Sequence, residues 1–123
     1  MILDLIEQAL STVDPNVTFG IADPKDIDAP WNYIVYFRTK ARPNENKNSL
    51  TDYFTVAVIR ENYVPDDVAY DIIDAMMKIP GMRLASDDME YDYLKKDDDT
   101  RIEVMTLSFC RAKKRCKNGN IQS

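Results

Sequence analysis

The chain has 123 residues, of which 45% are hydrophobic, 30% are charged and three are glycine. This length and composition indicate one globular domain and argue against a low-complexity or collagen-like chain. The formal net charge is −5 and the chain contains no histidine. The absence of histidine removes the commonest general base, the usual nitrogen ligand of zinc and every serine–histidine or cysteine–histidine pair.

Neither a membrane span nor a secretion signal is predicted. No stretch of the sequence approaches the ~20 consecutive apolar residues that a membrane-spanning helix needs. Asp4 and Glu7 stand near the start of the chain, where a signal peptide would carry basic residues. A disulfide between Cys110 and Cys116 would close only a small loop. We therefore expect a soluble intracellular protein with free thiols and no membrane partner.

The first part of the chain predicts a helix and a short strand. In residues 1–13 the apolar side chains recur at helical spacing, and Pro15 ends the pattern because the residue before a proline is steered out of the helical region. Residues 16–22 predict a strand. Residues 23–30, rich in proline and aspartate, predict a loop.

The centre of the chain predicts a long β-hairpin. Residues 31–40 and 51–60 are rich in the aromatic and β-branched side chains that suit strands, and residues 41–50 between them suit an exposed loop with a mobile tip. Both strands carry apolar side chains on both faces, as Val35 and Ile34 show in the first strand. Because a sheet that is apolar on both faces must be covered on both, we expect helices on one face and a neighbouring subunit on the other.

The second half of the chain predicts one helix and two further strands. Residues 64–79 predict the helix, with Pro65 in its first turn and a buried stripe formed by Val68, Ile72, Ala75, Met76 and Ile79. Residues 82–85 predict a short link. Residues 90–94 and 101–109 predict strands joined by a charged turn.

These elements predict an α+β fold with a mostly antiparallel sheet of about four or five strands. Two helices pack on one face of this sheet, and the hairpin carries a long extended loop. We expect a single domain at residues 1–110, followed by a basic, flexible tail at residues 111–123. The tail prediction rests on five basic residues, without an acid, that follow Cys110.

Clustered carboxylates are the main catalytic candidates, and each cluster has a structural explanation. Asp66 and Asp67 stand at a helix start, whereas residues 87–88 and 97–99 fall in turns where aspartate bonds to the local backbone. A metal-dependent hydrolase built on Asp99, Glu103 and Lys95 remains one hypothesis for the function. The scattered glycines cannot form a phosphate-binding loop. We expect no catalytic residue, no metal site and no cofactor.

Two polar segments are candidate partner contacts. The hairpin tip is either a solvated loop or an arm that orders when it meets a partner. The tail is either a solvated terminus or a small nucleic-acid-binding module that acts through counterion release. The candidate residues are Arg42, Asn44, Asn46 and Lys47 in the tip and Lys113, Lys114 and Arg115 in the tail.

The order of elements covers nearly the whole chain and suggests a family. An N-terminal helix precedes the strand that starts at Pro30 and Trp31, and residues 52–59 form the return strand. The helix after Pro65 and the strand at residues 91–93 complete the series. This series resembles the tail-completion, or tail-terminator, proteins of long-tailed phages.

The resemblance implies a structural protein without enzymatic activity or cofactor. Members form a ring, usually hexameric, that caps the tail tube and joins it to the head connector. The implied partners are further copies of the chain, the tail-tube protein and the head–tail connector protein, with DNA passing through an acidic bore without specific binding. The implied location is the host cytoplasm during assembly and then the head-proximal end of the tail in the virion. The alternatives are a nucleic-acid-binding module that uses the basic tail, or another head–tail connector component.

Overall fold

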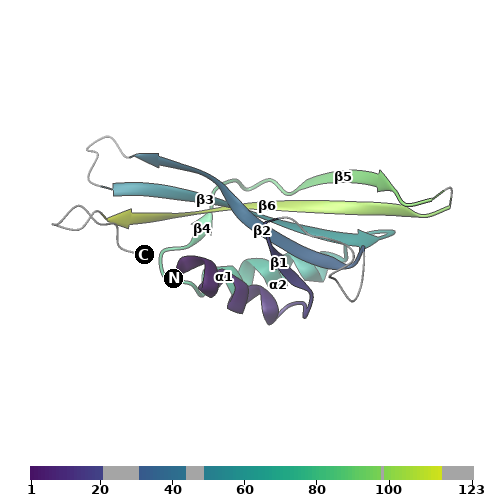
Figure 1. Ribbon diagram of the computed structural model, residues 1–123, viewed down its shortest axis with the longest axis horizontal. Helices are drawn as coiled ribbons and strands as arrows, with labels where there is room; N and C mark the ends of the chain where they lie inside the picture. Colours follow the sequence, from purple (N-terminus) through teal and green to yellow (C-terminus); the bar gives the residue numbers. More distant parts are fainter. Residues whose placement is uncertain (21–30, 44–48, 98, 115–123) are drawn as a thin grey trace.

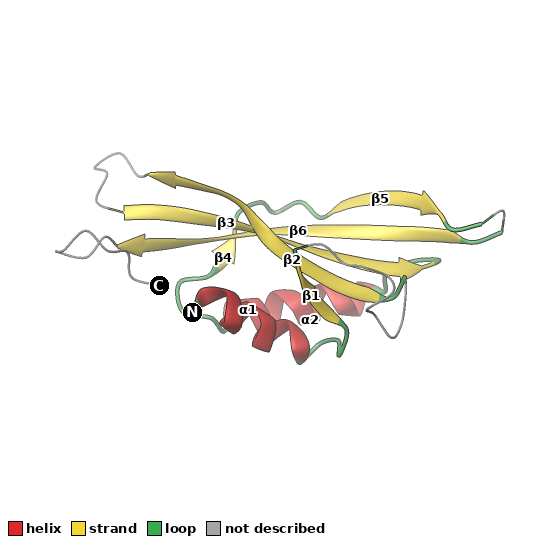
Figure 2. Cartoon of the chain, in the orientation of Figure 1, coloured by secondary structure: helices red, strands yellow, loops and turns green. Residues whose placement is uncertain are grey.

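The computed structural model describes residues 1–20, 31–43, 49–97 and 99–114. Within these residues the chain forms two helices and six strands in two layers, with both helices beneath one face of the sheet (Figures 1 and 2). The elements in chain order are α1 (Ile2–Ser11), β1 (Val17–Phe19), β2 (Tyr33–Pro43), β3 (Ser49–Glu61), α2 (Asp66–Met77), β4 (Arg83–Leu84), β5 (Glu90–Lys95) and β6 (Arg101–Lys114).

The sheet is mostly antiparallel. Its strand order is β1-β2-β3-β6-β4, and β5 also pairs with β6. The short strand β1 runs parallel to β2, and the other pairs are antiparallel. The predicted α+β class is confirmed. The described sheet has six strands, where about four or five were predicted. The sixth strand is β4, formed by two residues of the predicted link at 82–85 that pair with β6.

The main core lies between the helices and the sheet. The helix α1 buries Ile2, Ile6 and Leu10, which recur at a spacing of four residues and so share one face. The helix α2 buries four residues, of which Ala69 was missing from the predicted stripe. The sheet side chains packed against them are Ile34, Tyr36, Phe54, Val56, Val58, Met105, Leu107 and Phe109. These are the alternate positions that the strand pattern predicts for one face.

A second apolar cluster lies on the sheet face without helices. Its buried members are Val35, Ala57, Ile59 and Ile102, and Trp31, Tyr33, Phe37 and Val104 pack around them partly exposed. The prediction of apolar side chains on both faces is therefore confirmed. These four residues are already buried within a single chain, so this cluster does not require the neighbouring subunit that the pattern predicted to cover it.

The helices and β1 are shorter than predicted, and the boundaries at the hairpin loop and the tail differ further. The hairpin loop predicted at 41–50 is shorter, because β2 continues to Pro43 and β3 begins at Ser49. The strand β6 continues to Lys114, so residues 111–114 belong to the sheet and not to the predicted tail. The physical reason is pairing, since β3 offers a backbone partner to every residue of β6 from Ile102 to Lys114. Residues 44–48 and 115–123 lie outside the described residues.

Two buried carboxylates attach the connecting segments to the sheet. Asp14 follows α1, pairs with the guanidinium of Arg60 on β3 and accepts the Asn16 N–H at 2.8 Å. Glu103 on β6 accepts the buried N–H of Val64 at 2.8 Å, and Val64 directly precedes the N-cap of α2. In each case the carboxylate accepts a hydrogen bond from a backbone N–H in a connecting segment, where no neighbouring strand offers an acceptor.

Candidate functional site

A bulge in β2 places two cations over a tyrosine ring. In the β2–β3 ladder Arg38 lies opposite Phe54, but Lys40 lies opposite Tyr53, so Thr39 is an extra residue. The Thr39 and Thr55 hydroxyl oxygens are 2.6 Å apart and share a hydrogen bond across the two strands. After the bulge, Lys40 and Arg42 lie on the sheet face without helices. Without the bulge, regular alternation would place them on the helix side.

The tyrosine ring holds both cations by cation–π attraction. The Lys40 Nζ lies 4.8 Å from the centre of the Tyr53 ring, and the Arg42 Cζ lies 5.9 Å from it. Both distances are within the range over which an aromatic face attracts a cation. Both basic side chains are exposed, so they remain accessible to an anionic partner while the ring limits their motion.

A third cation joins this group from β4. Lys40, Tyr53, Cys110 and Arg83 form one row across four neighbouring strands. The Arg83 Nε donates to the sulfur of Cys110 at 3.2 Å, and this bond raises the pKa of Arg83. Cys110 has a free thiol, as expected, whereas Cys116 lies outside the described residues. We call Lys40, Arg42, Arg83 and Tyr53 the basic strand end.

A hollow of about 240 Å³ opens beside the basic strand end. Its polar lining consists of Thr39, Lys40, Tyr53, Ser86 and Ser108. Hydroxyl groups and an ammonium group are donors to carboxylate or phosphate oxygens. The arrangement suits an anionic group and offers no nucleophile–base pair.

The structure brings some of the predicted contact residues together. Arg42 lies in the basic strand end, and Lys113 and Lys114 belong to β6, where they pair with Leu50 and Ser49 of β3. Tip and tail residues thus meet at one end of the sheet. The other predicted contacts, Asn44, Asn46, Lys47 and Arg115, lie outside the described residues.

The sequence pattern missed Lys40, Tyr53 and Arg83. The basic residues at positions 40 and 42 were a usable signal, since residues two apart on a strand share a face. For Arg83 no sequence signal existed, because its position depends on pairing between β4 and the distant β6.

A groove runs between the two helices on the outer side of the helix layer. It consists of two adjoining hollows of about 400 Å³ and about 340 Å³, both lined by Thr12, Ala75 and Lys78. Apolar side chains that line it are Leu5, Ala9, Ile79 and Pro80. Asp71 and Asp74 line the other hollow. We call this feature the helix groove.

Asp71 and Asp74 of α2, beside the helix groove, are unfavourable for the helix itself. Asp67, Asp71 and Asp74 are exposed and follow one another at spacings of four and three residues. Such like charges destabilise an isolated helix by about 0.2–0.5 kcal/mol per pair. Asp74 lies in the last turn, where the helix dipole favours cations and where no basic residue is present. The structure shows no ion pair for these three acids within the described part of the chain.

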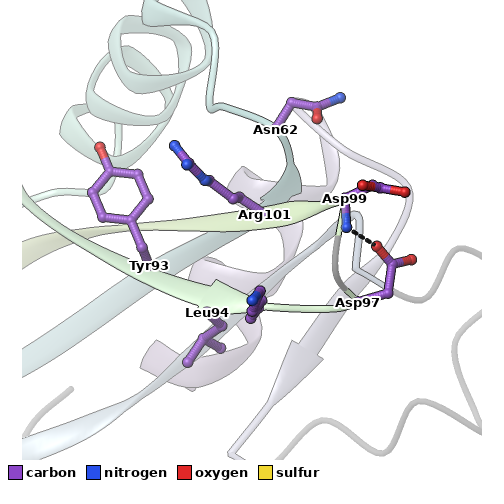
Figure 3. Close-up of a pocket in the computed structure, with 7 residues that line it drawn as sticks. Asn62, Tyr93, Leu94, Asp97, Asp99 and Arg101 are labelled. Atoms are coloured by element: carbon purple, nitrogen blue, oxygen red, sulfur yellow. Dashed lines mark hydrogen bonds between the residues drawn. The ribbon is translucent and has the colours of Figure 1, made fainter.

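A further hollow lies at the β5–β6 turn and is open to solvent (Figure 3). It measures about 630 Å³ and is lined by Asn62, Tyr93, Leu94, Lys95, Asp97, Asp99 and Arg101. The Asp97 Oδ1 accepts the N–H groups of Asp99 at 2.9 Å and Thr100 at 2.7 Å, which lowers the pKa of Asp97. For Asp97, the predicted turn role is confirmed.

The residues of the hydrolase hypothesis serve separate purposes. Asp99 and Lys95 line the hollow at the turn. Glu103 is buried and bonded to the Val64 N–H, and its hydrogen bond to Tyr93 raises the pKa of that tyrosine. Among the described residues no three histidine, cysteine or acidic side chains converge as metal ligands.

The strand β5 presents large side chains at an open sheet edge. All six of its residues are exposed, and the exposed fractions of Tyr91 and Tyr93 are 46% and 59%. It pairs with β6 on one side, and no other described strand pairs with its outer edge. Figure 1 shows this strand standing beyond the end of the helix layer.

Comparison of the chain with models of known protein families found no match, and comparison with curated protein sequences found none either. Function is therefore inferred from the surfaces described above. In the described residues, no helix is both long and apolar enough to cross a membrane.

Proposed function

We propose that the chain is a structural assembly protein that forms a homo-oligomeric ring. The observation that carries the proposal is the open edge of β5, with its exposed tyrosines. An unpaired strand edge is a template for pairing with another chain, and tyrosine is enriched in specific protein interfaces. The charged residues Glu90, Asp92 and Lys95 along β5 oppose uncontrolled edge pairing. A specific, limited contact between copies is the consequence.

The place of the ring rests on the resemblance of the element order to tail-terminator proteins. In this proposal the ring, usually hexameric in that family, ends the tail tube of a long-tailed phage and joins it to the head connector. Its partners are the tail-tube protein and the connector protein, and DNA passes through without specific binding. The protein acts without catalysis, in the host cytoplasm during assembly and then at the head-proximal end of the tail.

Native mass spectrometry of the chain, alone and with purified tail tubes, tests the proposal. The expected result is a closed oligomer, either free or on the tube end. The variant Tyr91→Ser should lose this oligomer and keep its thermal stability, because the Tyr91 side chain is 46% exposed. The matched control is Tyr63→Ser, whose tyrosine is 65% exposed and lies outside any strand or helix. A chain that remains monomeric even with tail tubes refutes the ring.

The basic strand end favours a second candidate, a small nucleic-acid-binding module. Lys40, Arg42 and Arg83 neutralise phosphates at most three at a time, so affinity for DNA should fall modestly with salt, with a logarithmic slope of about −3. Filter binding of double-stranded DNA to the wild type and to Lys40→Ala/Arg42→Ala measures this slope. Another connector component, the remaining alternative, predicts a ring that binds the connector protein and leaves the tail tube uncapped.

A further inference from the structure

We propose that neighbouring copies join head to tail by charge, with the basic strand end of one copy docked on the helix groove of the next. This inference rests on the proposed function, because it names a second contact between neighbouring copies of the ring, besides the β5 edge. The occupant of the helix groove is thus a second copy of this chain.

The two surfaces carry opposite charges. The basic strand end carries Lys40, Arg42 and Arg83. The stripe beside the helix groove carries Asp67, Asp71 and Asp74, and these three acids outnumber Lys78, the basic residue that lines both hollows of the groove. The helix groove adds an apolar floor, on which the stems of long basic side chains can pack. The hollow beside Lys40 offers hydroxyl donors to an incoming carboxylate.

The acidic stripe includes two acids that are unfavourable for α2, Asp71 and Asp74. Its like charges repel at helical spacing, and Asp74 opposes the dipole at the C-terminal end of the helix. A cationic partner would relieve both effects. The basic side chains are correspondingly held in place by the Tyr53 ring, which lowers the entropy lost on docking.

One chain cannot join its own two surfaces. The basic strand end lies on the sheet face without helices, as the register of Lys40 with Tyr53 shows, whereas the helix groove lies on the outer side of the helices. Figure 2 shows both helices on one side of the sheet, so the sheet and the helices lie between these two faces. A contact between two different surfaces of identical copies is heterologous, and it closes into a ring when the rotation between copies permits.

Charge exchange between two variants tests the contact. The variant Lys40→Glu/Arg42→Glu makes the strand end acidic, and Asp71→Lys/Asp74→Lys makes the stripe basic. Each variant alone should then oppose like charges and lose at least about tenfold in association. Their equimolar mixture should recover association as an alternating ring, because each altered surface meets a complementary one. Sedimentation velocity and native mass spectrometry measure all three samples at matched protein concentration.

A single-site pair controls for net charge. Arg38 lies on the same strand but faces the helix side, opposite Phe54. Arg38→Glu should therefore associate like the wild type, whereas Lys40→Glu should associate less. Raising the salt from about 0.1 M to about 1 M shortens the Debye length from about 10 Å to about 3 Å and should weaken wild-type association.

The outcomes separate this inference from the proposed ring. If Lys40→Glu/Arg42→Glu forms the wild-type oligomer, the charge contact is overturned and the ring stands. If that variant keeps the oligomer and loses only affinity for DNA, the basic strand end is a nucleic-acid site and the inference is likewise overturned. If the two variants associate only when mixed, but in open chains, the contact is supported and the closed ring is refuted. If neither the wild type nor the mixture associates at any concentration, alone or with tail tubes, both fail.

Discussion

Removal of the Glu103 carboxylate should destabilise the protein, because one buried backbone N–H, that of Val64, then loses its acceptor. Glu103 is 8% exposed, and its Oε1 accepts the N–H of Val64 at 2.8 Å. Val64 precedes Pro65, the N-cap of α2. This hydrogen bond therefore joins the β3–α2 connection to β6, which is remote in sequence.

The magnitude follows from what each substitution leaves behind. Glu103→Ala leaves the Val64 N–H buried without its acceptor, which costs about 1–3 kcal/mol. It also removes one buried methylene group, worth about 0.8 kcal/mol. The expected total loss in unfolding free energy is about 2–4 kcal/mol. Glu103→Gln retains an acceptor oxygen and the methylene groups, so it should lose only the charge-assisted part of the bond, about 1 kcal/mol.

Urea unfolding followed by circular dichroism measures both variants against the wild type. The slope of the free energy with urea should be unchanged, so that the midpoint shift reports stability alone. The reasoning is refuted if Glu103→Gln loses as much stability as Glu103→Ala, since charge and not the acceptor would then matter. It is also refuted if Glu103→Ala changes stability by less than about 0.5 kcal/mol.

Three further predictions address other parts of the fold. Burial, aided by two α1 carboxylates, raises the pKa of Tyr36 to about 12. The stability that its protonated form contributes is therefore present below pH 10 and lost as the pH rises through 12. In an ultraviolet titration of the tyrosines, the ionisation step near pH 12 should be present in the wild type and absent in Tyr36→Phe. Asp14→Ala should cost about 3 kcal/mol in chemical unfolding, because it leaves the Arg60 guanidinium without its partner; a double variant with Arg60→Met that loses the sum of the single effects would contradict this coupling. Phe109→Ala should cost about 3–5 kcal/mol in the same assay, and Phe109→Leu roughly half as much, because Phe109 is fully buried between the sheet and the helices.

Features that depend on neighbouring residues in the chain were predictable. The spacing of Ile2, Ile6 and Leu10 indicates the buried face of α1, and alternation in residues 33–37 and 53–59 indicates both apolar clusters. The turn role of Asp97 follows from the backbone donors two and three residues later. For the functional surfaces, the sequence pointed to Arg42 and to the run of basic residues after Cys110, but it assigned them to a loop and a tail.

By itself, the sequence determined the class of the fold, the order of its main elements and which side chains share a face, because these follow from the periods of the helix and the strand. Only the tertiary structure decided that β6 extends to Lys114, that Arg83 joins Tyr53 and that the bulge at Thr39 turns Lys40 to the face without helices. Each of these depends on a strand finding a backbone partner far away in the chain. A hydrogen-bond ladder of that kind is set by the register of whole strands, and no local residue pattern specifies it.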